Sequence, residues 1–310
     1  MEPSHSSDQG DSLESECCGN GCANCILDNK PKPSRRAQLS GQPNVILDYA
    51  DFRLVHKEAL MGDDKVLLLH FAYAVGSDKD DCILDIPPGH HVMLRIGSLL
   101  RPYSPFWTDF VRKEFKILVK LVLDGPMSQH LADLHIDDVL QFRGPIGSYL
   151  HDAKIAKYII IIAQGVATAP TIPLVEEVLD NEDDMSRICH IVCARDMNHV
   201  YFRDRLLEFA TYWNYQSCLY LPHQQCDTIV CQEKGHCSQD CDELRKSLRY
   251  RERAKIQRFD VHQLDVHVSS INKELLPIII IAGDSSFQQS IKKIVAAAEF
   301  PVFEENIYLL

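Results

Sequence analysis

The sequence predicts two domains in tandem, an antiparallel β-barrel followed by a Rossmann-like α/β domain. Residues 51–147 form short β-type runs separated by Gly, Pro and Asp, which is typical of a small antiparallel barrel. From residue 158 onward, apolar runs alternate with helical patterns, which indicates a parallel sheet with crossover helices. The length of 310 residues allows two domains of ordinary size, each with its own core.

Changes in composition set the expected boundaries. Residues 1–42 are rich in Ser, Gly, Pro, Asn and Asp, and we expect this segment to be mostly disordered around a group of cysteines. Residues 43–150 form the predicted barrel and 151–310 the α/β domain. Within the α/β domain, the polar and cysteine-bearing segment at about 226–270 is an expected insertion.

The individual elements follow from apolar periodicity and turn residues. In the first domain, the predicted strands are 51–60, 65–73, 90–96, 114–123 and 138–147, with one helix over 126–135. In the second domain, the predicted strands are 158–163, 187–194, 218–221 and 276–283, and the predicted helices are 171–181, 202–213 and 287–300.

Charge and hydropathy exclude several classes of protein. A net charge of -12 and a pI near 5.6 argue against a general binder of nucleic acid or anionic membranes. The longest apolar runs, 158–163 and 275–282, are far shorter than the roughly 20 residues of a membrane-spanning helix. The acidic N-terminus resembles neither a secretion signal nor a transit peptide, so the expected location is cytoplasmic. A monomer is the favoured state.

The stretch "LLRPYSPFW" has the residue types of a cofactor site. Arg101 can bind a diphosphate through two parallel hydrogen bonds, and Tyr103, on the same face of a strand, can lie against a flat ring. The hydroxyl of Ser104 can bond a ring nitrogen. The alternative is a plain strand that ends in a proline turn.

A second candidate follows in "VKLVLDGPMSQHL", where Gly125 and Ser128 precede a helical pattern. The N–H groups at the start of a helix attract phosphate. The alternative is an ordinary helix cap by Ser128.

The order of the motifs points to a family. The succession "PPGHHVML", "RPYSP", "LVKL", "GPMS", "FRGPIG", "QGVATAP" and "AGDSSF" resembles that of the ferredoxin-reductase type flavoenzymes, and specifically the NADH-cytochrome b5 reductase branch. The resemblance covers about residues 45–225 and 275–310.

The resemblance implies an FAD site in the first domain. It places the segment Arg101–Pro102–Tyr103–Ser104 at the cofactor: Arg101 would bind the flavin diphosphate, Tyr103 would pack on the flavin ring, and Ser104 would hydrogen-bond the reactive edge near N5. Tyr103 and Ser104 are therefore the candidate catalytic residues. Gly125, Met127 and Ser128 would wrap the FAD phosphates, with Pro126 in place of the usual Lys. Val119 and Lys120 belong to the matching strand, and Lys120 would help to hold NADH unless it is a solvated strand lysine.

The pyridine-nucleotide motifs depart further from the family. Against Gly-Gly-Thr-Gly-Ile-Thr-Pro, the chain has "QGVATAP", which keeps Gly165 and Pro170 and places Thr168 within the loop. A Cβ at Ala167 narrows the approach of the backbone to a pyrophosphate. The later loop keeps Gly283, but the neighbouring Asp284 puts an anion where a dinucleotide should dock. The acid expected to bind the adenosine ribose aligns with His223.

Two functions follow from this resemblance. The first is an enzyme that passes electrons from NADH, or alternatively NADPH, through FAD to a haem-protein acceptor such as cytochrome b5, with peripheral association at a membrane-bound acceptor as a further expectation. The second is an FAD-binding interaction protein in which the altered loops have weakened or abolished catalysis.

Twelve cysteines include two groups. "CCGNGCANC" contains Cys17, Cys18, Cys22 and Cys25, and it resembles the oxidoreductase-like segment that precedes the reductase domain in this branch. It is either a metal site or a flexible, thiol-rich docking motif. The second group, Cys226, Cys231, Cys237 and Cys241, lacks paired C-x-x-C spacing, so it is either a zinc-stiffened insertion or a polar loop.

Overall fold

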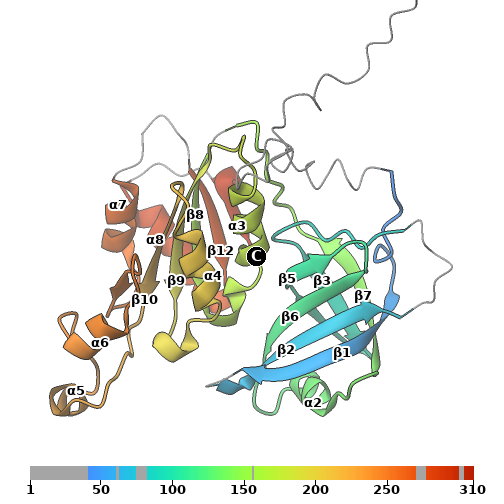
Figure 1. The fold of residues 1–310 in the computed structure, drawn as a ribbon, viewed down its shortest axis with the longest axis horizontal. Helices are drawn as coiled ribbons and strands as arrows, with labels where there is room; N and C mark the ends of the chain where they lie inside the picture. Colours follow the sequence, from blue (N-terminus) through green and yellow to red (C-terminus); the bar gives the residue numbers. More distant parts are fainter. Residues whose placement is uncertain (1–40, 61–62, 75–81, 156, 270–276, 300–303) are drawn as a thin grey trace, which may run out of the picture. The chain divides into compact units, whose positions relative to one another are not determined.

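The computed structural model describes residues 41–310, apart from 61–62, 75–81, 156, 270–276 and 300–303 (Figure 1). The predicted metal candidates Cys17, Cys18, Cys22 and Cys25 lie outside the described residues. Residues 42–310 form one unit that contains two sheets.

The first sheet has seven strands, and all of its strand pairs are antiparallel, as predicted. Its spatial order is β4-β3-β7-β1-β2-β6-β5. The strands are β1 (Ala50–Leu60), β2 (Asp63–Tyr73), β3 (His91–Ile96), β4 (Leu99–Tyr103), β5 (Pro105–Asp109), β6 (Glu114–Lys120) and β7 (Val139–Ile146), and the helix α2 (Pro126–Asp133) connects β6 with β7.

The predicted barrel is not closed by hydrogen bonds. Strands β4 and β5 are consecutive in the chain, yet they are the two ends of the sheet in the described residues. Pro102 in β4 and Pro105 at the start of β5 have no N–H group to donate to a further ladder. The correct description is therefore an open antiparallel sheet around an apolar core, which includes Phe52, Phe71 and Phe115.

The second sheet has six parallel strands in the order β11-β10-β9-β8-β12-β13, which confirms the α/β prediction. The strands are β8 (Tyr158–Gln164), β9 (Arg187–Cys193), β10 (Tyr215–Tyr220), β11 (Ala254–Lys255), β12 (Pro277–Ala282) and β13 (Ile307–Leu309). All six residues of β12 are buried, as expected of a strand that is covered on both faces.

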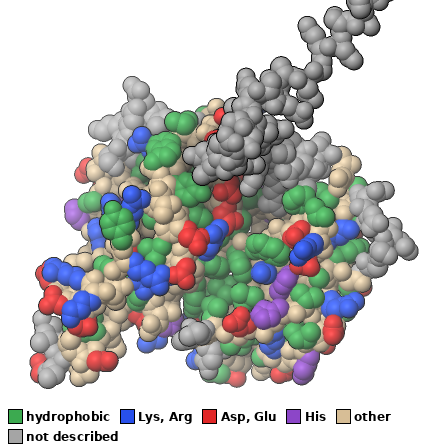
Figure 2. All heavy atoms as spheres, in the orientation of Figure 1, with side chains coloured by type: hydrophobic (Ala, Val, Ile, Leu, Met, Phe, Trp, Pro, Cys, Tyr) green, Lys and Arg blue, Asp and Glu red, His purple; other side chains and the backbone are tan. Residues whose placement is uncertain are grey.

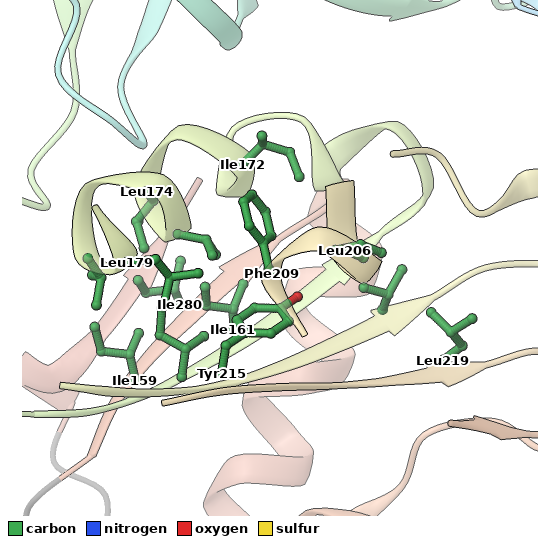
Figure 3. Close-up of a cluster of buried hydrophobic side chains, with 14 of the residues drawn as sticks. Ile159, Ile161, Ile172, Leu174, Leu179, Leu206, Phe209, Tyr215, Leu219 and Ile280 are labelled. Atoms are coloured by element: carbon green, nitrogen blue, oxygen red, sulfur yellow. The ribbon is translucent and has the colours of Figure 1, made fainter. Parts of the chain in front are cut away.

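Helices cover both faces of this sheet. Helices α3 (Thr171–Leu179) and α4 (Arg203–Phe209) lie on the face that receives Ile159 and Ile161, where Figure 3 shows Phe209 packed over the strands. Helices α7 (Val261–Val268) and α8 (Ser285–Ala297) lie on the opposite face, which receives Ile160 and Ile162. Because successive side chains of a β-strand point to opposite faces, neighbouring isoleucines of β8 contribute to both cores.

Only part of the segment predicted as an insertion, about 226–270, lies outside the α/β layers. It contains the short helices α5 (Ile229–Lys234) and α6 (Asp242–Ser247), which lie at the lower left of Figure 1. It also contains β11 and α7, and α7 contributes Leu264 and Val268 to the core behind the sheet. The sequence did not predict these two elements, because β11 has only two residues and α7 only eight, which is too short for a clear periodic pattern.

Candidate functional site

The edge strand β4 carries the first group of predicted site residues. Arg101 pairs with Leu94 of β3 and is exposed, and Pro102 beside it is also exposed. The Arg101 guanidinium donates to the carbonyl oxygen of Leu100 at 2.9 Å, and it has no carboxylate partner among the described residues. Arg101 is therefore a surface cation that is available to an anionic ligand.

Tyr103 and Ser104 lie next to this cation. Tyr103 packs against the edge of the apolar core and keeps part of its surface accessible. Burial raises the pKa of Tyr103 to about 12, although Arg101 opposes this shift, so the phenol stays protonated at neutral pH. Ser104 connects β4 to β5 and is partly exposed. A tyrosine ring and a hydroxyl are thus next to an exposed arginine.

The end of β6 supplies the next two residues. Val119 is 3 % exposed and packs inside the sheet's apolar core, so its side chain is not available to a ligand. Lys120 ends the strand and is exposed. Strand β6 also approaches β4, the strand of Arg101, although the two are not hydrogen-bonded to each other.

The start of α2 has the features of a phosphate cradle. Pro126 occupies the first turn, and Met127 and Ser128 follow it in the part of a helix whose N–H groups have no intrahelical partners. A Cβ at Gly125 would lie 3.2 Å from the carbonyl oxygen of Val122 and 3.3 Å from the Ser128 hydroxyl oxygen, which is crowded. The N–H of Val122 donates to Ser128 Oγ at 2.9 Å, so this hydroxyl fixes the entry to the helix, while the Met127 side chain is buried in the core.

The loop after β8 forms the 3-10 helix η2 (Gly165–Thr168), and it also approaches β6. Gly165 has a φ of 54°, a conformation that favours glycine, and no atom lies within 4 Å of the position where a Cβ would sit. The backbone at Gly165 is therefore open to a ligand. Strand β6 contacts both this loop and the strand that carries Arg101.

Most of the residues that follow Gly165 pack against the protein, and Ala167 stays partly exposed. Val166 and Ala169 belong to an apolar cluster with Val66 of β2 and Leu118 of β6. Thr168 is completely buried, and its hydroxyl oxygen has no hydrogen-bond partner among the described residues. Pro170 is also buried. In this conformation, Thr168 and Pro170 present no side chain to a ligand, and they support the loop from beneath.

The loop after β12 is occupied by a helix cap. Asp284 is the N-cap of α8, and its carboxylate accepts a hydrogen bond from the N–H of Phe287 at 2.8 Å. A Cβ at Gly283 would clash with the Phe287 ring in its present position, so glycine fits the turn that this ring covers. The sequence interpretation of Asp284 as an anion facing a dinucleotide overlooked this capping role, which an acid placed before an amphipathic helix can indicate.

The sequence did not predict the contacts that join the two sheets near η2. The Tyr201 hydroxyl donates to the Asp63 carboxylate at 2.8 Å, and the rings of Phe106 and Phe202 lie 5.0 Å apart. These residues adjoin the apolar cluster of Val166 and Leu118. No local motif marks them, because each contact joins residues from separate parts of the chain.

A cavity of about 510 Å³ lies elsewhere, beside β10, β11 and α7. Its lining includes Gln216, Arg253, Lys255 and His267, and it contains none of the predicted flavin or dinucleotide residues. Burial lowers the pKa of His267 to about 4, so this histidine is neutral at physiological pH. The cavity is therefore a separate feature of the sheet edge.

Comparison with known sequences supports the assignment of the first domain. Residues 51–151 match the family described as "Oxidoreductase FAD-binding domain". The mouse protein named "NADH-cytochrome b5 reductase-like" is 25% identical over 229 residues, which are 68% of this chain and 72% of the mouse chain. The human protein of the same name is 25% identical over 255 residues, with 74% and 79% covered.

Comparison with solved structures supports the two-domain fold. The cytochrome b5 reductase domain of nitrate reductase from Ulva prolifera superposes with a TM-score of 0.61 and 17% identity. The superposition covers 86% of this chain and 100% of that domain. The fold of this chain, an antiparallel sheet followed by a parallel α/β sheet, is thus similar to that of this domain.

Proposed function

We propose that this chain, which matches an FAD-binding oxidoreductase family and is similar to NADH-cytochrome b5 reductase-like proteins, oxidises NADH through bound FAD and reduces a one-electron acceptor such as cytochrome b5. NADPH is the alternative donor. FAD supplies the conversion between two-electron and one-electron chemistry, and the protein supplies binding, orientation and electrostatics.

The exposed Arg101 on β4, which has no carboxylate partner in the part of the chain that the structure describes, is the observation that carries this proposal. A guanidinium without a carboxylate partner can form two charge-assisted hydrogen bonds to a diphosphate. It lies two residues from a partly exposed tyrosine whose phenol stays neutral. Together these groups fit a ligand with an anionic diphosphate and a flat ring, as FAD has.

The remaining flavin contacts come from Ser104 and the start of α2. The Ser104 hydroxyl can donate to a ring nitrogen of the flavin. The N–H groups of Met127 and Ser128 can bind phosphate, with the helix dipole in support. The crowding at Gly125 favours glycine at the entry to this cradle.

NADH is assigned to the region around Gly165 and Lys120. Gly165 leaves its backbone open for a pyrophosphate, and Lys120 is an exposed cation at the end of the neighbouring strand. Gly283, in the turn after β12, completes the proposed set. Thr168 and Pro170 would act by holding the loop in place, since both are buried.

The partner and location are part of the same proposal. A haem protein such as cytochrome b5 is the proposed acceptor, and the proposed location is the cytoplasm, with peripheral association where the acceptor is membrane-bound. Within the described residues, no helix combines the length and the apolar character needed to span a bilayer. A monomer is the proposed oligomeric state.

The experiment is an anaerobic titration of the purified full chain with NADH and, separately, with NADPH, followed in the flavin absorbance. We expect flavin to co-purify and to be bleached by the donor but not by buffer. A protein that neither co-purifies with FAD nor binds added FAD would overturn the proposal.

A second candidate function is an FAD-binding interaction protein that no longer accepts NADH. The observation that favours it is the packing of Val166 and Ala169 into the apolar cluster beside β2 and β6, in a loop that has lost two of the family's glycines. If the protein binds flavin and neither NADH nor NADPH reduces that flavin in the titration, the result supports this second function and contradicts the proposed enzyme.

A further inference from the structure

Four cysteines that are separated in the sequence meet at one point between α5 and α6. All four sulfur atoms, from Cys226, Cys231, Cys237 and Cys241, lie within 4.8 Å of one another. Cys226 Sγ and Cys241 Sγ are 3.7 Å apart, and Cys231 Sγ and Cys241 Sγ are 3.8 Å apart. Four sulfurs that each lie about 2.3 Å from one tetrahedral zinc ion are about 3.8 Å from one another.

Other cysteine chemistries fit this geometry less well. A disulfide needs sulfur atoms about 2.05 Å apart, and all four cysteines are free. Iron–sulfur clusters spread their thiolates over two or more iron atoms, which separates the sulfurs more widely than a single ion does. Four thiolates around one point are the ligand set that a structural zinc ion prefers.

The backbone holds the cysteines in this arrangement without C-x-x-C spacing. The Cys237 N–H donates to the Gln224 carbonyl at 2.7 Å, and the Cys231 N–H donates to the Thr228 carbonyl at 3.0 Å. Gly235 ends α5 with a φ of 72°, which turns the chain back from Cys231 to Cys237. Cys241 is the N-cap of α6.

Among the side chains that the structure describes, this cysteine module, residues 222–253, has a small buried cluster. Its buried cluster consists of Cys231, Cys237, Cys241 and Leu244. Helices α5 and α6 have six residues each, which is too short for stability without tertiary support. The exposed residues of α6 include two acids and two bases, and charged side chains are prominent at the lower left of Figure 2.

The module covers the free edge of the parallel sheet. The Gln239 side chain donates to the carbonyl of Ala254 at 2.9 Å and accepts from the N–H of Ile256 at 2.9 Å, so it takes the place of a further strand beside β11. Arg203 of α4 donates to Glu252 and to the Ser247 carbonyl, both at 2.6 Å, which ties the module to the α/β core.

We propose that Cys226, Cys231, Cys237 and Cys241 bind one Zn²⁺ ion as four thiolates and that this ion holds the cysteine module against the edge of the sheet. Each thiol releases its proton to solvent when it binds, and no cysteine is oxidised or reduced. The ion joins α5 to the start of α6 through Cys231 and Cys241. This site is independent of FAD and of the dinucleotide.

The N-terminal cysteines must be replaced before zinc is measured, because their thiols could bind zinc themselves. The test uses the full chain with Cys17, Cys18, Cys22 and Cys25 all changed to Ser, purified without added chelator, and its zinc content is measured by mass spectrometry. We expect about one zinc per chain. In the same background, the double variant Cys231→Ser with Cys237→Ser should contain less than about one-tenth of a zinc ion per chain. The control Cys193→Ser, which changes a cysteine outside the module, should leave the zinc content unchanged.

Cobalt substitution keeps the proposal testable if the double variant does not fold. Co²⁺ added to the metal-free, tail-substituted chain should give the sulfur-to-cobalt charge-transfer and intense visible bands of a tetrahedral thiolate site. Hydrogen exchange should then show metal-dependent protection confined to residues 222–256. Absence of zinc from the tail-substituted chain, iron with inorganic sulfide in its place, or an octahedral cobalt spectrum would each overturn the proposal, whatever the flavin content.

Discussion

The flavin half and the dinucleotide half of the candidate site use their polar groups in opposite ways. At β4, Arg101 extends to the surface with no carboxylate partner among the described residues. At the start of α8, the Asp284 carboxylate is bonded within the protein, to the Phe287 N–H. Groups that remain unpaired are available to a ligand, whereas groups that cap a helix stabilise the fold.

The same contrast holds for the two glycine-containing turns. Gly125 opens a helix whose first N–H groups are free of intrahelical partners. Gly165 is also open, but Val166 and Ala169 next to it pack into the apolar cluster beside Leu118. The described groups of the flavin half are thus more accessible than Val166 and Ala169 of the dinucleotide half, which pack within the protein.

The largest expected effect tests the flavin half. Arg101→Ala should weaken FAD binding by about 1.5–3 kcal/mol, or roughly 10- to 150-fold, because a charge-assisted contact to the diphosphate is lost. Flavin fluorescence during titration with FAD measures the affinity. Arg53→Ala is the control, since Arg53 is an exposed arginine of the same sheet, on β1. Equal affinities of the two variants would remove Arg101 from the site.

The next effect tests the dinucleotide half as a scaffold. His190 is completely buried beneath the Gly165 loop, between the hydroxyls of Tyr215 at 3.0 Å and Thr171 at 3.3 Å, and Thr171 in turn donates to the Thr168 carbonyl at 2.7 Å. Burial lowers the pKa of His190 from 6.5 to about 3. Since the unfolded chain takes up this proton below about pH 6.5, stability is full above that pH and falls as the pH decreases toward 3.

The loss should be about 1.4 kcal/mol per pH unit, or about 2 kcal/mol between pH 6.5 and pH 5. Urea unfolding of the full chain at pH 7 and pH 5 measures it. The His190→Gln variant should lose this contribution and show a shallower pH dependence. Identical pH dependence in the variant and the natural chain would mean that His190 is protonated in the folded state.

The same two regions show what the sequence could predict. Arg101, Tyr103 and Ser104 were identified because their residue types form a contiguous motif, and the apolar strands because their patterns are strong. The open sheet was missed, since strand pairing at β4 and β5 is not a local property. The meeting of Cys226 with Cys241 was left undecided for the same reason, because the fold, and not the spacing, brings the sulfurs together.

A smaller effect tests whether Asp284 acts as a helix cap or as an anion that repels the dinucleotide. Asp284→Ala should lower stability by about 1 kcal/mol through loss of the helix cap, while Asp284→Asn should keep the cap and the stability. Because the carboxylate faces the N–H groups of α8, the Asn variant should change NADH affinity less than about twofold, which is below 0.5 kcal/mol. A large gain in NADH affinity with Asp284→Asn would show that the charge repels the dinucleotide and that the capping interpretation is incomplete.

The smallest effect tests whether the Gly165 loop still receives a dinucleotide. Ala167 is partly exposed beside the open backbone of Gly165. Ala167→Gly removes the Cβ nearest to the proposed pyrophosphate position and should tighten NADH binding about threefold, or roughly 0.6 kcal/mol, in the anaerobic flavin titration. Ala210→Gly, at the end of α4, controls for the added backbone freedom. If Ala167→Gly and Ala210→Gly give equal NADH affinities, no pyrophosphate approaches this turn, and the packing of Val166 has closed the loop to its former ligand.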